Sequence, residues 1–193
     1  MRIALFGGSF NPIHVGHLAI ADAIIGQGLA DRVWLTVSPH NPLKPRADLL
    51  PEQLRLTWVR TAAEGHRGVE ASDCEFSLPR PSYTYQTLRH LREEHPADEF
   101  LLCIGGDNWA NFSAWREPEE IRRHHRLIVY PRSTQGFGGQ ETAPEGVTFL
   151  RAPLIDVSST DIRRRLDKGE SIEGLVPPSI CESIQSEWKK IHP

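Results

Sequence analysis

Directly after a short apolar run, Arg2–Phe6, the chain reads Gly7-Gly8-Ser9-Phe10-Asn11-Pro12-Ile13-His14-Val15-Gly16-His17. The apolar run predicts a buried strand, and the residues from Gly16 onward show helical spacing. Glycines at the end of a strand let the backbone approach a phosphate closely, and the helix that follows directs its unpaired N–H groups toward it. The stretch therefore predicts a strand, an anion-binding loop and a helix.

Two histidines lie at the end of this loop. His14 and His17 are three positions apart, so at the start of a helix they share one side. Two imidazoles there can donate hydrogen bonds to phosphate oxygens. Either histidine alone would more simply be an exposed residue of a tight turn, but the combination with the glycines favours an anion site. The loop is neither the dinucleotide fingerprint nor the P-loop, since G-x-G-x-x-G and G-K-[ST] are both missing.

Strand-length and helix-length patterns alternate along the rest of the chain. Strands are expected at Arg32–Val37, Val69–Cys74 (the weakest), Phe100–Ile104, Leu127–Tyr130 and Val147–Leu150. Helices are expected at Gly16–Gln27, Pro51–Glu64, Tyr83–Glu94 and Ser179–Ile191. This alternation predicts an α/β fold with an open parallel sheet and helices on both faces, as a single domain over residues 1–193.

Composition excludes several classes of protein. With 193 residues, 39% hydrophobic and 24% charged, the chain has the composition of a soluble globular domain. No run approaches the roughly 18 apolar residues of a membrane span, and no signal peptide is apparent, so a cytoplasmic protein is expected. The net charge of −3 argues against nucleic-acid binding. Three scattered cysteines predict neither a disulfide framework nor a zinc site, and Cys103, inside an apolar strand, is expected to be inert.

A second candidate motif, Val157-Ser158-Ser159-Thr160-Asp161-Ile162-Arg163, lies toward the C-terminus. Ser158 and Asp161 have the spacing of a capping box, which would make this an ordinary helix start. Hydroxyl groups, a helix N-terminus and Arg163 one turn inside can also clamp a triphosphate.

Together the two motifs resemble the His-x-Gly-His nucleotidyltransferase superfamily, which implies a Rossmann-like fold. Within it, the chain from Arg2 to about Leu166 is similar to the bacterial nicotinate-nucleotide adenylyltransferases. Further matching segments are Pro81–Leu88, Ile104–Asp107, Phe112–Arg116 and Tyr130–Arg132. The resemblance implies transfer of AMP from ATP to nicotinate mononucleotide, which yields nicotinate adenine dinucleotide and pyrophosphate in NAD biosynthesis.

The resemblance also implies site residues, of which His14, His17 and Arg163 would be catalytic. ATP would be bound by Gly7, Gly8, Ser9, Phe10, His14, His17, Gly105, Asp107, Ser158, Ser159, Thr160 and Arg163. The mononucleotide would be bound by Asn11, Asn41, Lys44, Thr84, Tyr85, Asp107, Trp115, Arg116 and Arg132. No acidic cluster offers a metal cage, so Mg²⁺ is expected on the ATP phosphates, with water as its other ligands. The partners are then small molecules, with no nucleic acid or membrane, and homo-oligomerisation stays open.

Several of these residues also have plain structural interpretations. Trp115 and Trp109 could fill the core, Asp107 could cap a helix beginning near Asn108, and Thr84 could cap the helix through Leu91. Lys44 could be a solvated loop charge, and His124-His125, with its neighbouring arginines, a solvated helix end. Two other functions stay open: a phosphopantetheine adenylyltransferase-like enzyme, and a non-catalytic nucleotide-sensing module.

Overall fold

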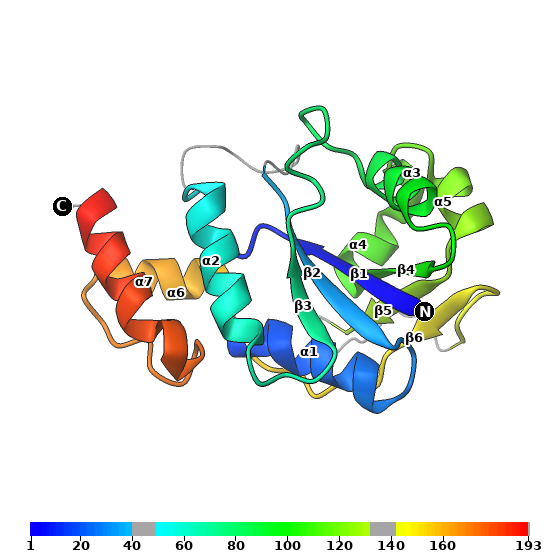
Figure 1. Cartoon of the computed structure of the whole chain (residues 1–193). Coiled ribbons are helices and arrows are strands. Elements are labelled where there is room, and N and C mark those ends of the chain that lie inside the picture. The colour runs from blue at the N-terminus through cyan, green and yellow to red at the C-terminus, as the bar shows by residue number, and fades with distance from the viewer. Residues whose placement is uncertain (40–48, 132–141, 193) are drawn as a thin grey trace.

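The computed structural model describes residues 1–39, 49–131 and 142–192, and its strands form one parallel sheet. The sheet order is β3-β2-β1-β4-β5-β6 (Figure 1), and each neighbouring pair is parallel. This order is that of the doubly wound Rossmann fold, so the predicted fold class is confirmed. The strands are β1 (Arg2–Gly8), β2 (Arg32–Val37), β3 (Val69–Ser72), β4 (Glu99–Gly105), β5 (Leu127–Tyr130) and β6 (Val147–Phe149).

Helices connect the strands and follow the last of them. The described helices are α1 (Val15–Gly26), α2 (Glu52–Ala63), α3 (Thr84–Glu94), α4 (Gly106–Ala110), the 3₁₀ helix η1 (Phe112–Ala114), α5 (Pro118–His124), α6 (Ser159–Asp167) and α7 (Pro178–Ile191). The four long predicted helices are confirmed, and α6 begins where the capping box placed it. The elements α4, η1 and α5 are too short to show an apolar period, so the sequence indicated α4 and α5 only through features of their ends.

Alternate residues of β1 enter two separate cores. Ala4 and Phe6 pack into a cluster with apolar residues of α1, α2, α6 and α7. Ile3 and Leu5 pack into a second cluster with residues of α3, η1 and α5. The two helical layers therefore cover opposite faces of the sheet (Figure 1).

The sheet order reverses between β1 and β4. From β1 the chain moves outward to β2 and β3, and it then returns to β4 on the other side of β1. Ligands of such sheets bind beyond the carboxyl ends of the strands at this reversal. Here these ends are Gly8 and Gly105, which are the places where the sequence predicted the site. No helix in the described ranges is long and apolar enough to cross a membrane.

Candidate active site

The two histidines of the first motif stack on one another at the start of α1. Their ring centroids are 3.6 Å apart with an interplanar angle of 25°. The backbone N–H of His14, the N-cap residue, donates a hydrogen bond of 3.2 Å to Nδ1 of His17. Since Nδ1 is the acceptor, the neutral His17 ring carries its proton on Nε2. The fold thus fixes both the orientation and the tautomer of His17.

Aromatic rings and glycines hold this pair in place. The His17 ring makes edge contacts with Phe10 at 4.9 Å and Phe6 at 5.9 Å. A Cβ atom on Gly8 would lie 3.0 Å from Cζ of Phe10, and one on Gly16 would lie 3.1 Å from Nδ1 of His14. A side chain at either position would therefore be in tight contact with an aromatic ring, which would have to shift slightly to accommodate it.

Two other residues of the loop show different constraints. Phe10 is buried and has a positive φ of 44°, a backbone conformation that non-glycine residues seldom adopt. Gly7 is exposed, and a Cβ atom built on it would meet no atom within 4 Å. The space in front of Gly7 is therefore open to a ligand that approaches the end of β1.

The second motif docks onto the first. Ser159 Oγ donates a 2.9 Å hydrogen bond to the carbonyl oxygen of Pro12, across 147 residues of sequence. Arg163 Nη1 donates a 2.9 Å hydrogen bond to the carbonyl oxygen of Asn11. Ser158 caps α6 as the capping-box interpretation predicted, because its Oγ accepts a hydrogen bond from the Asp161 N–H at 3.1 Å. The N-terminus of α6, with Thr160 exposed in its first turn, therefore lies beside the histidine loop.

The segments predicted to bind the mononucleotide also meet. The guanidinium carbon of Arg116 lies 4.5 Å from the centre of the Tyr83 ring, within the range of a cation–π contact. Tyr83 in turn lies near Tyr85, with their ring centroids 6.4 Å apart. Trp115 is half-buried and packs against Phe112 at 5.3 Å. The fold thus joins the start of α3 to the end of η1.

Two helix-start predictions are wrong by one or two residues. The N-cap of α3 is Tyr83, so Thr84 is the first helical residue rather than the cap. The N-cap of α4 is Gly105, and Asp107 is exposed in the first turn. Both side chains therefore remain at the carboxyl edge of the sheet without the capping role.

Of the other residues singled out in the sequence, some lie in the loop or the core, and three lie outside the described residues. The side-chain oxygen of Asn11 accepts a 3.2 Å hydrogen bond from the Leu50 N–H. Trp109 is half-buried and packs at the edge of the second core, near Phe112. Cys103 is buried, and burial raises its pKa strongly, so the thiol stays protonated. The predicted ligands Asn41, Lys44 and Arg132 lie outside the described residues.

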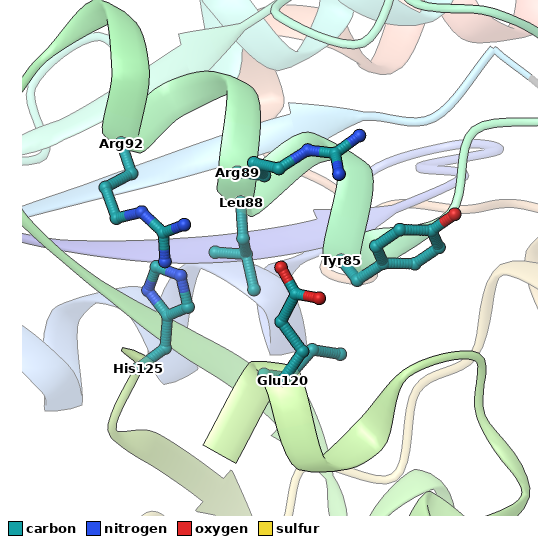
Figure 2. A pocket seen from close by; sticks show the side chains of 7 residues that line it. Tyr85, Leu88, Arg89, Arg92, Glu120 and His125 are labelled. Atoms are coloured by element: carbon teal, nitrogen blue, oxygen red, sulfur yellow. The ribbon is translucent and has the colours of Figure 1, made fainter. Parts of the chain in front are cut away.

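His125 corrects one expectation. It is buried rather than solvated, its Nδ1 lies 2.9 Å from the carbonyl oxygen of Phe100, and burial lowers its pKa. It lines a hollow between α3 and α5, whose lining Figure 2 shows. Of the residues that line this hollow, Tyr85 alone belongs to the predicted site. The hollow thus lies beside the candidate active site rather than in it.

Sequence reasoning missed two buried charges near the site. Arg55, on α2, donates to the carbonyl oxygens of Ser9 and Ser38, and burial lowers its pKa to about 10. Its spacing from Trp58 places a charge on the apolar face of α2, a signal that could have revealed it. Glu75 follows β3, and burial raises its pKa against the opposing effect of three hydroxyl donors. No sequence pattern marks Glu75.

Comparisons with known proteins agree on one family. The family described as "Cytidylyltransferase-like" matches residues 5–165. A relative from Bacteroides fragilis (strain YCH46), named "Probable nicotinate-nucleotide adenylyltransferase", is 44% identical over 184 residues, which cover 95% of this chain and 90% of the relative. A relative of the same name from Flavobacterium johnsoniae is 42% identical over 185 residues, which cover 95% of this chain and 96% of the relative.

Solved structures show the same fold. A structure from Vibrio parahaemolyticus has a TM-score of 0.72 and 26% identity, covering 95% of this chain and 97% of that one. The Plasmodium falciparum nicotinic acid mononucleotide adenylyltransferase complexed with NaAD has a TM-score of 0.74. The Plasmodium falciparum structure is 20% identical to this chain and covers 99% of this chain and 95% of that one, so the similarity to it concerns the fold alone.

Proposed function

The chain belongs to the cytidylyltransferase-like family, and on this premise we propose that it is a nicotinate-nucleotide adenylyltransferase of NAD biosynthesis. The reaction transfers AMP from ATP to nicotinate mononucleotide and releases pyrophosphate. One observation carries the proposal from the structure: Ser159 and Arg163 bond to the loop that precedes the stacked histidines. Two motifs far apart in sequence thus form one anion-binding surface at the reversal of the sheet order.

The chemistry needs positioning more than acid–base catalysis. The attacking group is the phosphate of the mononucleotide, whose second pKa of about 6 leaves it largely dianionic at neutral pH. One of its oxygens forms a bond to the α-phosphorus of ATP while the bond to pyrophosphate breaks. The obstacles are repulsion between anions and the need for an in-line approach.

The residues of the two motifs meet those obstacles. His17 offers its Nε2–H to the phosphoryl group that is transferred, and His14 stacks beside it. Arg163 donates one N–H to the Asn11 carbonyl oxygen, and its planar guanidinium group has further N–H donors for the triphosphate. The remaining ATP ligands are proposed as Gly7, Gly8, Ser9, Phe10, Gly105, Asp107, Ser158, Ser159 and Thr160.

A divalent cation fits this site as a companion of ATP. In the described part of the chain, no three or more His, Cys, Asp or Glu side chains gather into a metal cage. We propose Mg²⁺, which keeps several waters and is readily held by substrate phosphates. Bound there, it would neutralise charge on the triphosphate.

The acceptor side lies where α3 begins. We propose that Thr84, Tyr85, Trp115 and Arg116 surround the pyridine ring, on the strength of the Arg116–Tyr83 contact that joins the two segments. We propose that Asp107, which is exposed in the first turn of α4 directly after β4, binds ribose hydroxyls. The other proposed ligands of the mononucleotide are Asn11, Asn41, Lys44 and Arg132.

We propose that residues 1–193 act as one nucleotidyltransferase domain. The indole N–H of Trp58 on α2 donates a 3.0 Å hydrogen bond to Ser183 on α7, and α7 shares the first core. The C-terminal helix is therefore part of the same packed unit. We propose a cytoplasmic location for the enzyme, because its substrate ATP is supplied there.

Pyrophosphate release tests the proposed function. The purified protein is incubated with ATP and Mg²⁺ together with nicotinate mononucleotide, with phosphopantetheine, or with no acceptor. We expect release with the mononucleotide and formation of the dinucleotide. Release with phosphopantetheine would favour that enzyme class, and no release with either acceptor would favour a sensing module.

Arg163→Lys should weaken ATP binding in particular. A guanidinium can contact two phosphate oxygens and the Asn11 carbonyl together, whereas an ammonium is a point charge. We expect the KM for ATP to rise about tenfold, or about 1.4 kcal/mol, with the KM for the mononucleotide nearly unchanged. The matched control is Arg164→Lys, because Arg164 is exposed on the same helix and pairs with Asp161. Equal increases in both KM values would contradict the assignment.

Trp115→Ala should weaken acceptor binding. Stacking of a base on an aromatic side chain is worth about 1–3 kcal/mol, so the KM for the mononucleotide should rise roughly 10-fold or more. Steady-state kinetics should show that the KM for ATP is nearly unchanged in Trp115→Ala. The Trp115→Phe variant should largely restore the wild-type KM for the mononucleotide. A KM for ATP that rises in parallel would instead indicate that Trp115 serves the second core, where it packs against Phe112.

A further inference from the structure

Two buried groups of opposite charge meet at one serine beside the active site. Ser38 follows β2, and its carbonyl oxygen accepts a 2.9 Å hydrogen bond from Arg55 Nη1. Its hydroxyl donates a 2.9 Å hydrogen bond to Glu75 Oε2. Arg55 is fully buried and Glu75 is 7% exposed. Neither charge belongs to the two motifs that bind ATP in the proposed function.

Arg55 reaches from Ser38 to the anion-binding loop. Its Nη1 also donates to the carbonyl oxygen of Ser9, in the loop that follows β1. Its Nε donates a 2.9 Å hydrogen bond to the carbonyl oxygen of Leu50, and Nη2 lies 3.3 Å from that of Pro39. A buried guanidinium is costly unless its N–H groups are satisfied, so these carbonyls are held around it.

Glu75 reaches from Ser38 to the acceptor side. Its Oε2 accepts a 2.9 Å hydrogen bond from Ser82 Oγ, and its Oε1 accepts a 3.0 Å hydrogen bond from Thr87 Oγ1. Ser82 and Thr87 flank the start of α3, where Thr84 and Tyr85 lie. The carboxylate therefore fixes the segment proposed to bind the pyridine ring.

The polarity of Ser38 suits a link between the two charges. Its carbonyl presents a negative end to the guanidinium, and its hydroxyl presents a positive end to the carboxylate. A shift of either buried charge would leave polar groups unsatisfied, at a cost that ordinary loop contacts do not impose. The contacts form a continuous path from Ser9 through Arg55, Ser38 and Glu75 to Ser82 and Thr87.

We propose that Arg55, Ser38 and Glu75 are positioning residues that couple the two substrate subsites, so that binding of ATP strengthens binding of the mononucleotide. The proposal rests on the proposed function for the identity of the two ligands. Coupling of this kind is reciprocal, since each ligand favours the arrangement that the other needs. In the wild-type protein we expect at least fivefold tighter binding of one substrate in the presence of the other.

Calorimetry tests the coupling. The dissociation constant of nicotinate mononucleotide is measured on the full chain with and without saturating α,β-methylene-ATP and Mg²⁺, which form a non-reacting complex. Ser38→Ala removes the hydroxyl that bonds to Glu75, and Glu75→Gln removes the charge while keeping the size. We expect the ratio of the two dissociation constants to fall to about twofold or less in both variants.

Matched controls separate coupling from general damage. Ser77→Ala removes an exposed hydroxyl two positions from Glu75, and Glu93→Gln removes an exposed charge on α3. Both controls should keep the wild-type ratio. If Glu75→Gln fails to fold, Ser38→Ala, which loses a single hydroxyl, decides the outcome.

A ratio near one in the wild type, or an unchanged ratio in a folded Ser38→Ala variant, would overturn the coupling. Failure of the proposed function would look different, because the wild-type protein would then bind no nicotinate mononucleotide under either condition.

Discussion

The His17→Ala variant is expected to turn over about 100-fold more slowly than the wild type, with the KM for ATP changed less than about threefold. The hydrogen bond from the His14 N–H occupies Nδ1 of His17, so the neutral ring carries its donor N–H at Nε2. A positioned donor to the group that carries developing charge contributes about 3 kcal/mol in the transition state, which corresponds to at least 100-fold in rate. Binding of ground-state ATP, shared among many donors, depends less on this one.

Steady-state kinetics with ATP and nicotinate mononucleotide checks this prediction. The matched control is His66→Ala. His66 is half-buried, and its Nδ1 lies 2.9 Å from a carboxylate oxygen of Asp22, which is on the side of α1 away from His17. His14→Ala should affect ATP binding more than His17→Ala does, if His14 faces the outer phosphates. Turnover of a folded His17→Ala protein near the wild-type rate would exclude the proposed role of the histidine.

Nicotinate mononucleotide should be preferred over nicotinamide mononucleotide by ten- to several-hundred-fold in kcat/KM. The two acceptors differ at one group on the pyridine ring, a carboxylate that only accepts hydrogen bonds or a carboxamide that also donates them. Thr84 and Tyr85 are the first two residues of α3, where helix N–H groups lack intrahelical partners and favour an anion. A carboxamide N–H facing these donors would be mispaired, which costs about 1–3 kcal/mol.

Arg116 should contribute to this preference through its charge. It is exposed and lies over Tyr83, next to the start of α3. We therefore expect Arg116→Gln to lower the acid-to-amide ratio several-fold, whereas the control Arg122→Gln, an exposed residue of α5, should not. Side-by-side kcat/KM values for the two mononucleotides decide the matter. Equal values, or a preference for the amide, would contradict the assignment of the acceptor and leave the nucleotidyltransferase chemistry intact.

Much of the fold could be predicted from short stretches of sequence. The apolar runs and helical periods are local, and they located all six strands of the described residues and the long helices, including the weakly patterned β3. The first motif was also predictable, because the glycines, His14 and His17 act on one another within a single strand–loop–helix unit. The lengths of α4 and η1, and the exact cap of α3, were not predictable. Elements of one or two turns show no period, and neighbouring residues compete for the cap.

Tertiary structure alone decided what the charged and polar groups contact. Arg163 bonds to the Asn11 carbonyl from 152 positions away, and Arg55 and Glu75 are buried among carbonyls and hydroxyls of several segments. Backbone carbonyls and single hydroxyls carry no periodic signal, so a sequence does not reveal which buried charge they will satisfy. For the same reason the sequence predicted a solvated helix end at His125, whereas in the structure its Nδ1 is buried in contact with the Phe100 carbonyl oxygen. Apolar patterning set the layers of this protein, because burial follows the periodicity of the sequence. Hydrogen bonds between distant segments set the geometry of the candidate site, because pairing depends on where the completed fold places each partner.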